Sequence, residues 1–450
     1  MKILTHLILL AIVAWSCSTT TNSTKAPDIS EIMYPEKAKD MVIYEVNIRQ
    51  YTPEGTFNAF QDHLPRLEEL GVDILWVMPV QPIGEKNRKG GLGSYYSIRD
   101  YTAVNPEFGT MEDFKNLVDD AHSRGMKVIL DWVANHTSFD HAWTEIEGYH
   151  NTDSLGNVTW PEGTDWTDVA DLNFENMDMQ NDMISALRFW INETDIDGYR
   201  CDVAGAVPMD FWNRAKDSLD MDKDLFMLAE EEKPEMHEDA FHMTYGWGFH
   251  HTMNDVAKGE KNADDLVNFI NEDYSRYPTN AFRMNFTTNH DENSWNGTVF
   301  ERFGEGHKAF AVLAFTIQGM PLIYSGQEAG LNKRLAFFEK DSIDWDDVKY
   351  QEFYSKLVDI KHDNAALFNG EFGGRPTFIP TGNTNVIAYK RSKGDNTVTT
   401  LINLSDQPQD ISIAELISFT DFFSGVEVSE KMDSLEPYAY YVGANAANNE

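Results

Sequence analysis

The sequence predicts a (β/α)₈ barrel with a short insertion after its third strand, followed by a C-terminal antiparallel β-sandwich domain. From Asp40 onward, short β-rich runs alternate with amphipathic helical runs, as in βα units that build a parallel sheet. Eight such units within ~320 residues favour a closed barrel over an open sheet. From about Ala366 the pattern changes to short strands and turns, which is typical of a small β domain.

The predicted barrel strands are, in chain order, residues 42–48, 73–79, 127–133, 198–203, 225–230, 245–249, 284–289 and 322–325. The predicted helices are residues 57–70, 111–124, 182–193, 210–219, 263–274, 306–317 and 348–362. The second of these helices has the clearest signals, because Thr110 is a good N-cap and Gly125 is a good C-terminal stop. The later strands are expected at residues 384–391, 397–404 and 439–442.

We expect five segments along the chain. They are a signal peptide at 1–16, a flexible tether at 17–36, a catalytic barrel at 37–365, an insertion within that barrel at 137–177, and a C-terminal β domain at 366–450. The insertion is long and polar and carries Trp143, Trp160 and Trp166. A loop of this length in a compact domain is usually functional.

The N-terminus has the pattern of an export signal. Lys2 precedes an apolar run that is too short to span a bilayer. The run ends in Ala14-Trp15-Ser16-Cys17, which resembles a bacterial lipoprotein signal. We therefore expect an exported protein, a periplasmic or outer-membrane or cell-surface lipoprotein attached through a lipid on Cys17. The alternative is an ordinary cleaved signal followed by an incidental cysteine.

Composition narrows the class of partner. The chain has 450 residues, and 36 Lys and Arg against 74 Asp and Glu give a net charge of −38. Such a surface repels nucleic acid and anionic lipid headgroups, so a neutral substrate is favoured and no nucleic acid is expected to bind. Hydrophobic residues make up 42% of the chain, which is enough for a real core and excludes intrinsic disorder.

Polar side chains gather where four of the predicted strands end, and barrel active sites lie at such ends. These residues are Asp131, Asn135 and His136 after strand three, Arg200 and Asp202 on strand four, Glu230 on strand five, and His290 and Asp291 on strand seven. Strand alternation points Arg200 and Asp202 into the barrel. The cation is expected to lower the pKa of Asp202, while the apolar run before Glu230 is expected to raise the pKa of that carboxyl. Cleavage of an acetal needs such a pair of carboxylates.

Each of these residues has a simpler structural interpretation. Arg200 and Asp202 could form a buried structural ion pair, and each histidine alone is more often a core histidine than a ligand. Glu230 stands beside Glu231 and Glu232, so a solvated acidic run is an alternative, and Glu232 is the alternative acid. The coincidence of four strand ends, each carrying a group that one reaction needs, favours catalysis.

These segments resemble the four signature regions of the α-amylase superfamily, the family-thirteen glycoside hydrolases, in the family's order. Residues 93–101 with 105–109, residues 171–173 and residues 319–328 resemble further family segments. The resemblance covers about residues 40–450.

The resemblance implies a role for each site residue. Asp202 would be the nucleophile, Glu230 the acid/base and Asp291 the third carboxylate, which grips the distorted sugar at the reaction centre. Arg200 would orient Asp202. His136 and His290 would hydrogen-bond the same sugar, and Tyr96 would stack under it, whereas Asp131 and Asn135 are expected to be structural supports. The three insertion tryptophans are candidate sugar platforms or loop-packing residues.

The sequence also departs from the family. The segment Asp202-Val203-Ala204-Gly205 lacks the Lys-His pair that many relatives carry there and that contributes to a calcium site. We therefore expect that no cofactor is required, with Asn135 and Asp171 as the candidate ligands if calcium binds.

The resemblance implies a retaining hydrolase acting on α-1,4-glucosidic bonds of starch-like α-glucan or malto-oligosaccharide, with endo-acting α-amylase as the first expectation. The alternatives within the family are a cyclomaltodextrinase or neopullulanase-like enzyme, an α-glucosidase and a transglycosylase. Outside this chemistry, the alternatives are a non-catalytic glycan-binding barrel and a metal-dependent barrel hydrolase.

Overall fold

The computed structural model describes residues 33–413, 418–429 and 432–445. The predicted signal peptide at 1–16, Cys17 and most of the predicted tether lie outside these residues. The folded unit begins at Tyr34, three residues before the expected start of the barrel at residue 37. Tyr34 is buried, and its ring contacts those of Phe226 and His242. Among the helices of the described residues, none combines the length and apolar character needed to cross a membrane.

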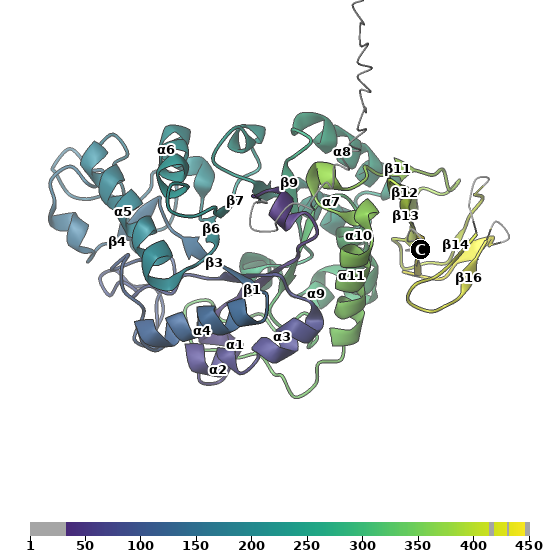
Figure 1. Cartoon of the computed structure of the whole chain (residues 1–450), viewed down its shortest axis with the longest axis horizontal. Coiled ribbons are helices and arrows are strands. Elements are labelled where there is room, and N and C mark those ends of the chain that lie inside the picture. The colour runs from purple at the N-terminus through teal and green to yellow at the C-terminus, as the bar shows by residue number, and fades with distance from the viewer. Residues whose placement is uncertain (1–32, 414–417, 430–431, 446–450) are drawn as a thin grey trace, which may run out of the picture. The chain divides into compact units, whose positions relative to one another are not determined.

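Parallel strands close into the expected barrel, with the helices around it (Figure 1). Within the described residues the strand order around the barrel is β1-β10-β9-β8-β7-β6-β3-β2, and β2 pairs with β1 to complete the circle. The barrel strands are β1 (Ile43–Val46), β2 (Ile74–Val77), β3 (Lys127–Trp132), β6 (Gly198–Cys201), β7 (Phe226–Ala229), β8 (Met243–Tyr245), β9 (Phe282–Asn285) and β10 (Met320–Tyr324). The predicted fold class is therefore confirmed.

The helices of the barrel region are α1 (Ile48–Tyr51), α2 (Phe57–Gln61), α3 (Leu64–Leu70), α4 (Met111–Ser123), α5 (Met177–Thr194), α6 (Met209–Leu219), α7 (Trp247–Ala257), α8 (Ala263–Arg276), α9 (Val299–Phe303), α10 (His307–Thr316) and α11 (Gln351–Asp363). At α4 the prediction is confirmed in detail, because Thr110 and Asp113 form a capping box. The helix expected at 57–70 is two helices, since the chain turns between Gln61 and Leu64.

The sixth strand was placed wrongly at 245–249. β8 ends at Tyr245, and α7 begins at Trp247. The apolar run at this point serves the helix, whose buried residues Phe249, Met253 and Val256 recur every three or four positions. A short apolar run alone does not distinguish a strand from the first turn of a helix.

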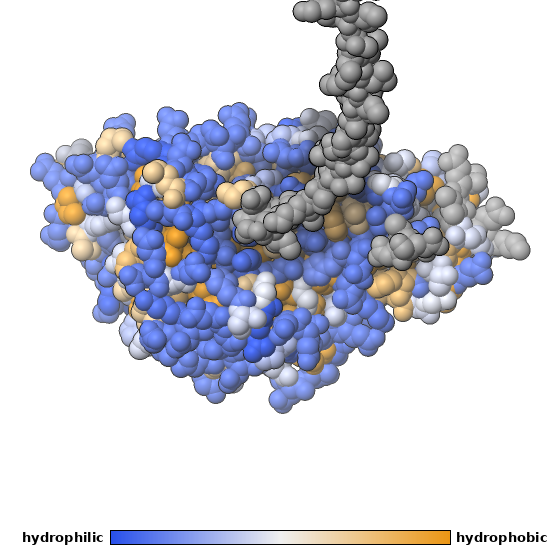
Figure 2. Space-filling model, viewed as in Figure 1, coloured by the Kyte–Doolittle hydropathy of each residue, from blue (hydrophilic) through white to orange (hydrophobic). Residues whose placement is uncertain are grey.

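Strand alternation divides the core into two parts. Inward side chains such as Ile43, Trp76, Ile129 and Leu228 fill the barrel. Their neighbours in the strands, such as Tyr44, Leu130 and Met227, pack outward against the helices. Hydrophilic residues cover most of the face seen in Figure 2, as the acidic composition leads one to expect.

Two further units extend the barrel. After β3, the insertion contains the antiparallel pair β4 (His136–Ser138) and β5 (Val169–Asp171). At the C-terminus a four-stranded antiparallel sheet has the order β11-β12-β13-β18, and two ribbons, β14-β17 and β15-β16, accompany it. The C-terminal strands are β11 (Thr377–Phe378), β12 (Val386–Lys393), β13 (Asn396–Asn403), β14 (Gln409–Asp410), β15 (Phe419–Thr420), β16 (Glu427–Val428), β17 (Ser434–Leu435) and β18 (Tyr440–Asn445).

The C-terminal sheet packs on the barrel through one face. Ile387 and Tyr389 belong to the main core, whereas Val386 and Ala388 belong to a separate core shared with the ribbons. Arg391 is fully buried at this junction and donates hydrogen bonds to the carbonyl oxygens of residues 316, 317, 368 and 374. This arginine therefore fastens β12 to the barrel helices and the loops that follow them.

Candidate active site

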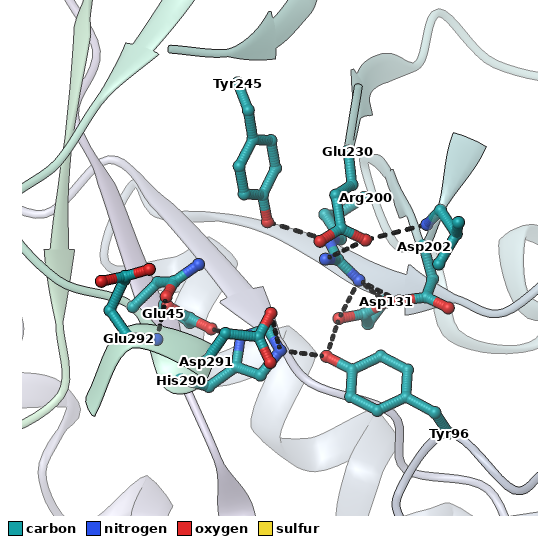
Figure 3. A network of polar contacts seen from close by, with 12 residues as sticks. Glu45, Tyr96, Asp131, Arg200, Asp202, Glu230, Tyr245, His290, Asp291 and Glu292 are labelled. Atoms are coloured by element: carbon teal, nitrogen blue, oxygen red, sulfur yellow. Dashed lines mark hydrogen bonds and ion pairs between the residues drawn. The ribbon is translucent and has the colours of Figure 1, made fainter. Parts of the chain in front are cut away.

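Arg200 lies at the centre of a buried network of charged side chains at the ends of the barrel strands (Figure 3). Its Nη1 lies 2.9 Å from Asp202 Oδ1 and 3.0 Å from Asp131 Oδ1. Its Nη2 lies 2.8 Å from Glu230 Oε2. One guanidinium from β6 thus binds carboxylates from three neighbouring strand ends, and its planar fork holds them in fixed positions.

The three proposed catalytic carboxylates line a single cavity of about 610 Å³. Asp202, Glu230 and Asp291 border it together with Tyr96, His136 and His290, so the residues selected from four separate strand ends meet in one place. Asp202 is 6% exposed. The size of the cavity is typical of sites for small organic ligands.

A second chain of contacts joins β1 to the same cavity. Glu45, which is fully buried on β1, binds His290 Nδ1 through Oε1 at 2.5 Å. On its other side His290 Nε2 lies 2.9 Å from the hydroxyl of Tyr96 and 3.4 Å from Asp291 Oδ2. The Tyr96 hydroxyl in turn donates to Asp131 Oδ2 at 3.2 Å, so this chain meets the Arg200 network (Figure 3).

Charge determines the state of His290. Burial alone would lower the pKa of this imidazole, but Asp291 and Glu45 outweigh that effect and raise the pKa to about 9. His290 is therefore a cation at neutral pH and donates from both ring nitrogens. His136 differs, because burial lowers its pKa to about 4 and leaves the ring neutral.

The pKa of Glu230 is raised, as the sequence predicted. Burial is the largest cause, Asp291 adds to the shift and Arg200 opposes it. The expectation for Asp202 is wrong in this geometry. Burial, with repulsion from Glu230 and Asp131, outweighs Arg200 and raises the pKa of Asp202 well above its usual value. Three buried carboxylates share the Arg200 guanidinium, so its charge does not by itself hold the pKa of each of them below the usual value.

The backbone also positions Glu230. The Val203 N–H donates to Glu230 Oε2 at 2.8 Å. Val203 adopts a left-handed conformation with φ +42° and ψ +43°, which is rare for a β-branched residue and costs ~1–3 kcal/mol. This strained residue directly follows Asp202. Its conformation therefore fixes the backbone beside Asp202 and also directs its N–H at the carboxylate of Glu230.

Glu232, the alternative acid, points away from the cavity. Its Oε1 lies 2.7 Å from Arg283 Nη2 and accepts from the Gly248 N–H at 2.9 Å. The geometry therefore gives Glu232 a structural role at the start of α7, and of the two candidate acids Glu230 is the one that borders the cavity.

The candidate calcium ligands lie close to each other. His136 pairs with Asp171 across β4 and β5, and Asn135 directly precedes His136. Both side chains already have partners: Asn135 Nδ2 lies 3.2 Å from His136 Nδ1, and Asp171 Oδ2 accepts from Asn151 at 2.7 Å. In the described part of the chain, no group of three or more His, Cys, Asp and Glu side chains is placed to hold a metal ion.

Aromatic side chains form much of the cavity wall. Of the insertion tryptophans, Trp166 borders the cavity, while Trp143 packs against His141 and Tyr149 of the insertion and against Tyr101 of the loop after β2. Trp160 is 45% exposed and does not border the cavity. Of these three insertion tryptophans, Trp166 is thus the one placed to contact a ligand in this cavity.

Sequence reasoning missed several residues of the site. They are Glu45, Tyr245, Lys89, Trp295, Phe337 and Phe338. Strand alternation could have identified the first two. Glu45 lies two residues after the inward Ile43 on a buried strand, and Tyr245 lies two residues after the inward Met243, so both side chains also point inward. Lys89, Phe337 and Phe338 lie on loops whose course the sequence pattern did not reveal, and Trp295 lies in the short helical segment Glu292–Asn296 after β9.

Comparison with known proteins adds an independent line of evidence. Residues 20–157 and 163–366 match the family model described as the alpha amylase catalytic domain. Residues 377–442 match the model of the maltogenic amylase C-terminal domain. These matches cover the barrel and the C-terminal sheet.

Individual proteins show the same similarity. The chain is 29% identical to alpha-amylase MalA of Haloarcula japonica over 87% of its own length, and it spans only 59% of that relative. It is 26% identical to a cyclomaltodextrinase of Thermoanaerobacter pseudethanolicus, covering 86% of this chain and 70% of the relative. Among solved structures, a noncanonic maltogenic alpha-amylase, AmyB of Thermotoga neapolitana, superposes with a TM-score of 0.81 at 28% identity, over 91% of this chain and 99% of that one.

Proposed function

Because the chain belongs to the alpha-amylase family of glycoside hydrolases, we propose that it cleaves α-1,4-glucosidic bonds in short malto-oligosaccharides and cyclomaltodextrins with retention of configuration. The match of residues 377–442 to a maltogenic amylase domain supports this substrate class, as does the similarity to a cyclomaltodextrinase and to a maltogenic amylase. Endo-acting α-amylase activity on starch, the first expectation from the sequence, is the second candidate. It is supported by the similarity to alpha-amylase MalA.

The observation that carries the catalytic proposal is the cavity in which Asp202, Glu230 and Asp291 meet. In the first step an oxygen of Asp202 attacks the anomeric carbon, and the bond from that carbon to the glycosidic oxygen breaks. The departing oxygen takes the proton of Glu230. The products are a glycosyl ester of Asp202, a shortened glucan with a free hydroxyl, and ionised Glu230.

In the second step ionised Glu230 takes a proton from water, and the water oxygen attacks the same carbon. The ester bond breaks, which restores Asp202 as a carboxylate and Glu230 as an acid. Two inversions leave the configuration unchanged.

The neighbouring residues serve these steps by placing charge. Arg200 disperses the negative charge that returns to Asp202 when the ester is hydrolysed. His290, held as a cation by Glu45 and Asp291, donates from Nε2 to the Tyr96 hydroxyl and places its positive charge at the cavity wall. Tyr96, oriented through its hydroxyl by His290 and Asp131, offers its ring as a platform for the sugar.

The test is a product profile. Purified enzyme would be incubated with β-cyclodextrin, pullulan, soluble starch, maltose and maltoheptaose, and initial rates and products would be measured. We expect the highest kcat/KM on cyclodextrin and maltoheptaose, with maltose as a main product. Faster hydrolysis of starch, with long products, would favour the second candidate. The absence of hydrolysis of every glucan would overturn the proposal.

We propose that catalysis needs no metal. The mechanism assigns every proton transfer to Glu230 and every charge to side chains of the network, and the carboxylate of Asp171 is already engaged by Asn151. Activity after dialysis against a chelator should equal that of untreated enzyme. A loss of activity that calcium restores, together with a lower melting temperature, would show that calcium binds and supports the fold.

We also propose that the protein is exported and carries a lipid on Cys17. This proposal rests on the sequence of residues 1–17 alone. Labelling of cells with a radioactive fatty acid should mark the wild-type protein and leave the Cys17→Ala variant unlabelled. Equal labelling, or a wild-type protein found only in the cytosol, would contradict it.

A further inference from the structure

The loop after β2 crosses one side of the catalytic cavity. We call residues 84–93 of this loop the crossing segment. At one end it is bound to the loop after β10, because the Gly91 N–H donates to Glu339 Oε1 at 2.6 Å and the Leu92 N–H donates to the Phe338 carbonyl at 2.9 Å. The approach is close, since a Cβ added at Gly90 would lie 2.4 Å from Phe338 Cβ.

Lys89 binds the same segment to the insertion. Its ammonium group donates to the Asp165 carbonyl at 2.8 Å and lies 3.2 Å from Asp168 Oδ1. Asp168 is itself held in place, because it is buried and its carbonyl accepts from Ser97 Oγ at 3.0 Å. An ammonium group has three N–H donors, so two partners leave one donor available to a ligand.

Both anchoring regions border the catalytic cavity. Lys89, Asp165 and Asp168 line it together with Phe337 and Phe338. The crossing segment therefore connects two walls of the cavity. Lys89 contacts the insertion at Asp165 and Asp168, where it borders the cavity, and the Glu85 N–H donates to Asp140 Oδ2 of the same insertion at 2.9 Å. The Lys89 side chain is one-third exposed, as expected for a group at the rim of a binding site.

The position of the crossing segment relative to the reacting bond follows from its neighbours. The segment leads directly into Ser94 and Tyr96. Phe337, which precedes Phe338 in the loop after β10, stacks its ring on that of Tyr96, with the ring centroids 6.3 Å apart and the ring planes at 11°. Glu230 comes from β7 and is fixed by Val203. Since Glu230 gives its proton to the leaving group, we infer that the sugars that stay on the enzyme lie beside Tyr96, next to the crossing segment.

We propose that Lys89 and the crossing segment border the sugars at the non-reducing side of the cleaved bond and so determine how many glucose units of a linear chain are bound there. The inference rests on the proposed function, because it specifies the length of linear α-glucan that this same site accepts. The free donor of Lys89 would bind a hydroxyl of the last glucose held there. A linear chain would then be cut a fixed short distance from its non-reducing end, whereas a cyclic glucan, which has no end, would first be opened at one bond.

The experiment compares Lys89→Ala with the matched control Lys86→Ala, which removes an exposed lysine of the same segment that does not border the cavity. Maltoheptaose labelled at its reducing end would be digested, and the distribution of labelled products would be measured together with kcat/KM for maltotriose and maltoheptaose. For wild type and Lys86→Ala we expect long labelled products, since cleavage occurs near the other end. For Lys89→Ala we expect shorter labelled products.

In Lys89→Ala we expect the ratio of kcat/KM for maltoheptaose to that for maltotriose to rise by about threefold to tenfold. This factor corresponds to the free energy of roughly one hydrogen bond. Asp168→Asn is a second variant that removes the ion pair and keeps Lys89, and it should shift the products in the same direction. Thermal melting would establish that each variant is folded. An unchanged product distribution in folded, active Lys89→Ala and Asp168→Asn would overturn the inference alone, whereas a wild-type enzyme inactive on both substrates would overturn the proposed function.

Discussion

Replacing Glu45 by Gln should remove a pH-dependent contribution to stability that the Glu45–His290 pair makes. The Glu45 carboxylate lies 2.5 Å from His290 Nδ1, and both side chains are buried. Gln keeps the size of the side chain and removes its charge. The buried imidazolium would then lose one of its two carboxylate neighbours, and the pKa of His290 would fall.

The magnitude follows from the pKa of His290, which the fold raises from 6.5 to about 9. A difference of about 2.5 units corresponds to about 3 kcal/mol at 1.36 kcal/mol per unit. Because the folded pKa is the higher one, this stabilisation is fully present below pH 6.5 and is lost as pH rises towards 9. The stability of the wild type relative to Glu45→Gln should therefore be greater at pH 6 than at pH 9. The change is at most about 3 kcal/mol, because Asp291 also raises the pKa of His290 and remains in the variant.

The assay is urea unfolding of both proteins at pH 6, 7, 8 and 9, with the difference in unfolding free energy plotted against pH. Other titrating groups are common to both proteins, so most of their contribution cancels in the difference. Glu292→Gln is the matched control, because Glu292 also pairs with a buried histidine, His250, at 3.1 Å. Hydrogen bonding to His250 and the charge of Arg302 overcome burial and lower the pKa of Glu292 to about 2, while burial lowers that of His250.

The loss in the control should therefore change little between pH 7 and 9, because the pKa values of both groups of its pair lie below their usual values of 4.5 and 6.5. A loss in Glu45→Gln that is equally independent of pH would refute the reasoning. It would mean that Glu45 acts through packing and that His290 is neutral in the folded protein.

Three other changes test separate parts of the site. Glu230→Gln should lower kcat on maltoheptaose by about 10²–10⁴ with little change in substrate binding. Glu232→Gln should keep kcat and lower the stability of the fold, because it breaks the ion pair with Arg283. The opposite pattern in initial rates would mean that Glu232 is the acid. Tyr96→Phe should bind substrate almost as well as wild type, because it keeps the aromatic ring. Tyr96→Ala should lose both substrate affinity and turnover. Equal kinetics of the two variants would exclude stacking of the sugar on the Tyr96 ring. Arg391→Met should lower the unfolding free energy by about 3 kcal/mol or more, because four carbonyl groups at the junction with the C-terminal sheet lose their hydrogen-bond donor. A change below about 0.5 kcal/mol in denaturant unfolding would contradict a stabilising role of Arg391 at this junction.

The sequence predicted the barrel and the charged side chains on its strands because both follow from local rules. The alternation that turns Arg200 and Asp202 inward while Tyr199 and Cys201 pack outward is a property of any strand, and it holds here. Glu230 directly follows β7, as expected, whereas the strand expected at 284–289 is β9 (Phe282–Asn285), so His290 lies on the segment after the strand. The wrong placement of the sixth strand has a local cause too, since an apolar run at the start of a helix resembles a short strand.

The features of the site that could not be predicted from the sequence depend on contacts between distant loops. Lys89 meets Asp168, and Phe337 meets Tyr96, only because three loops converge at one rim of the barrel. The raised pKa of Asp202 was also beyond the sequence. It depends first on the burial of Asp202 and then on the other carboxylates that share Arg200, whereas spacing along one strand reveals only the nearest pair.

The most direct test of the central claim is to identify the residue that carries the covalent sugar. An α-linked 5-fluoroglucosyl fluoride would be incubated with the enzyme to trap the glycosyl ester, and the modified peptide would be mapped by mass spectrometry. The account predicts a single label on Asp202, absent in Asp202→Asn, and α-configured product in the first minutes of an NMR time course with wild type. A label on another carboxylate, or product of inverted configuration, would contradict it.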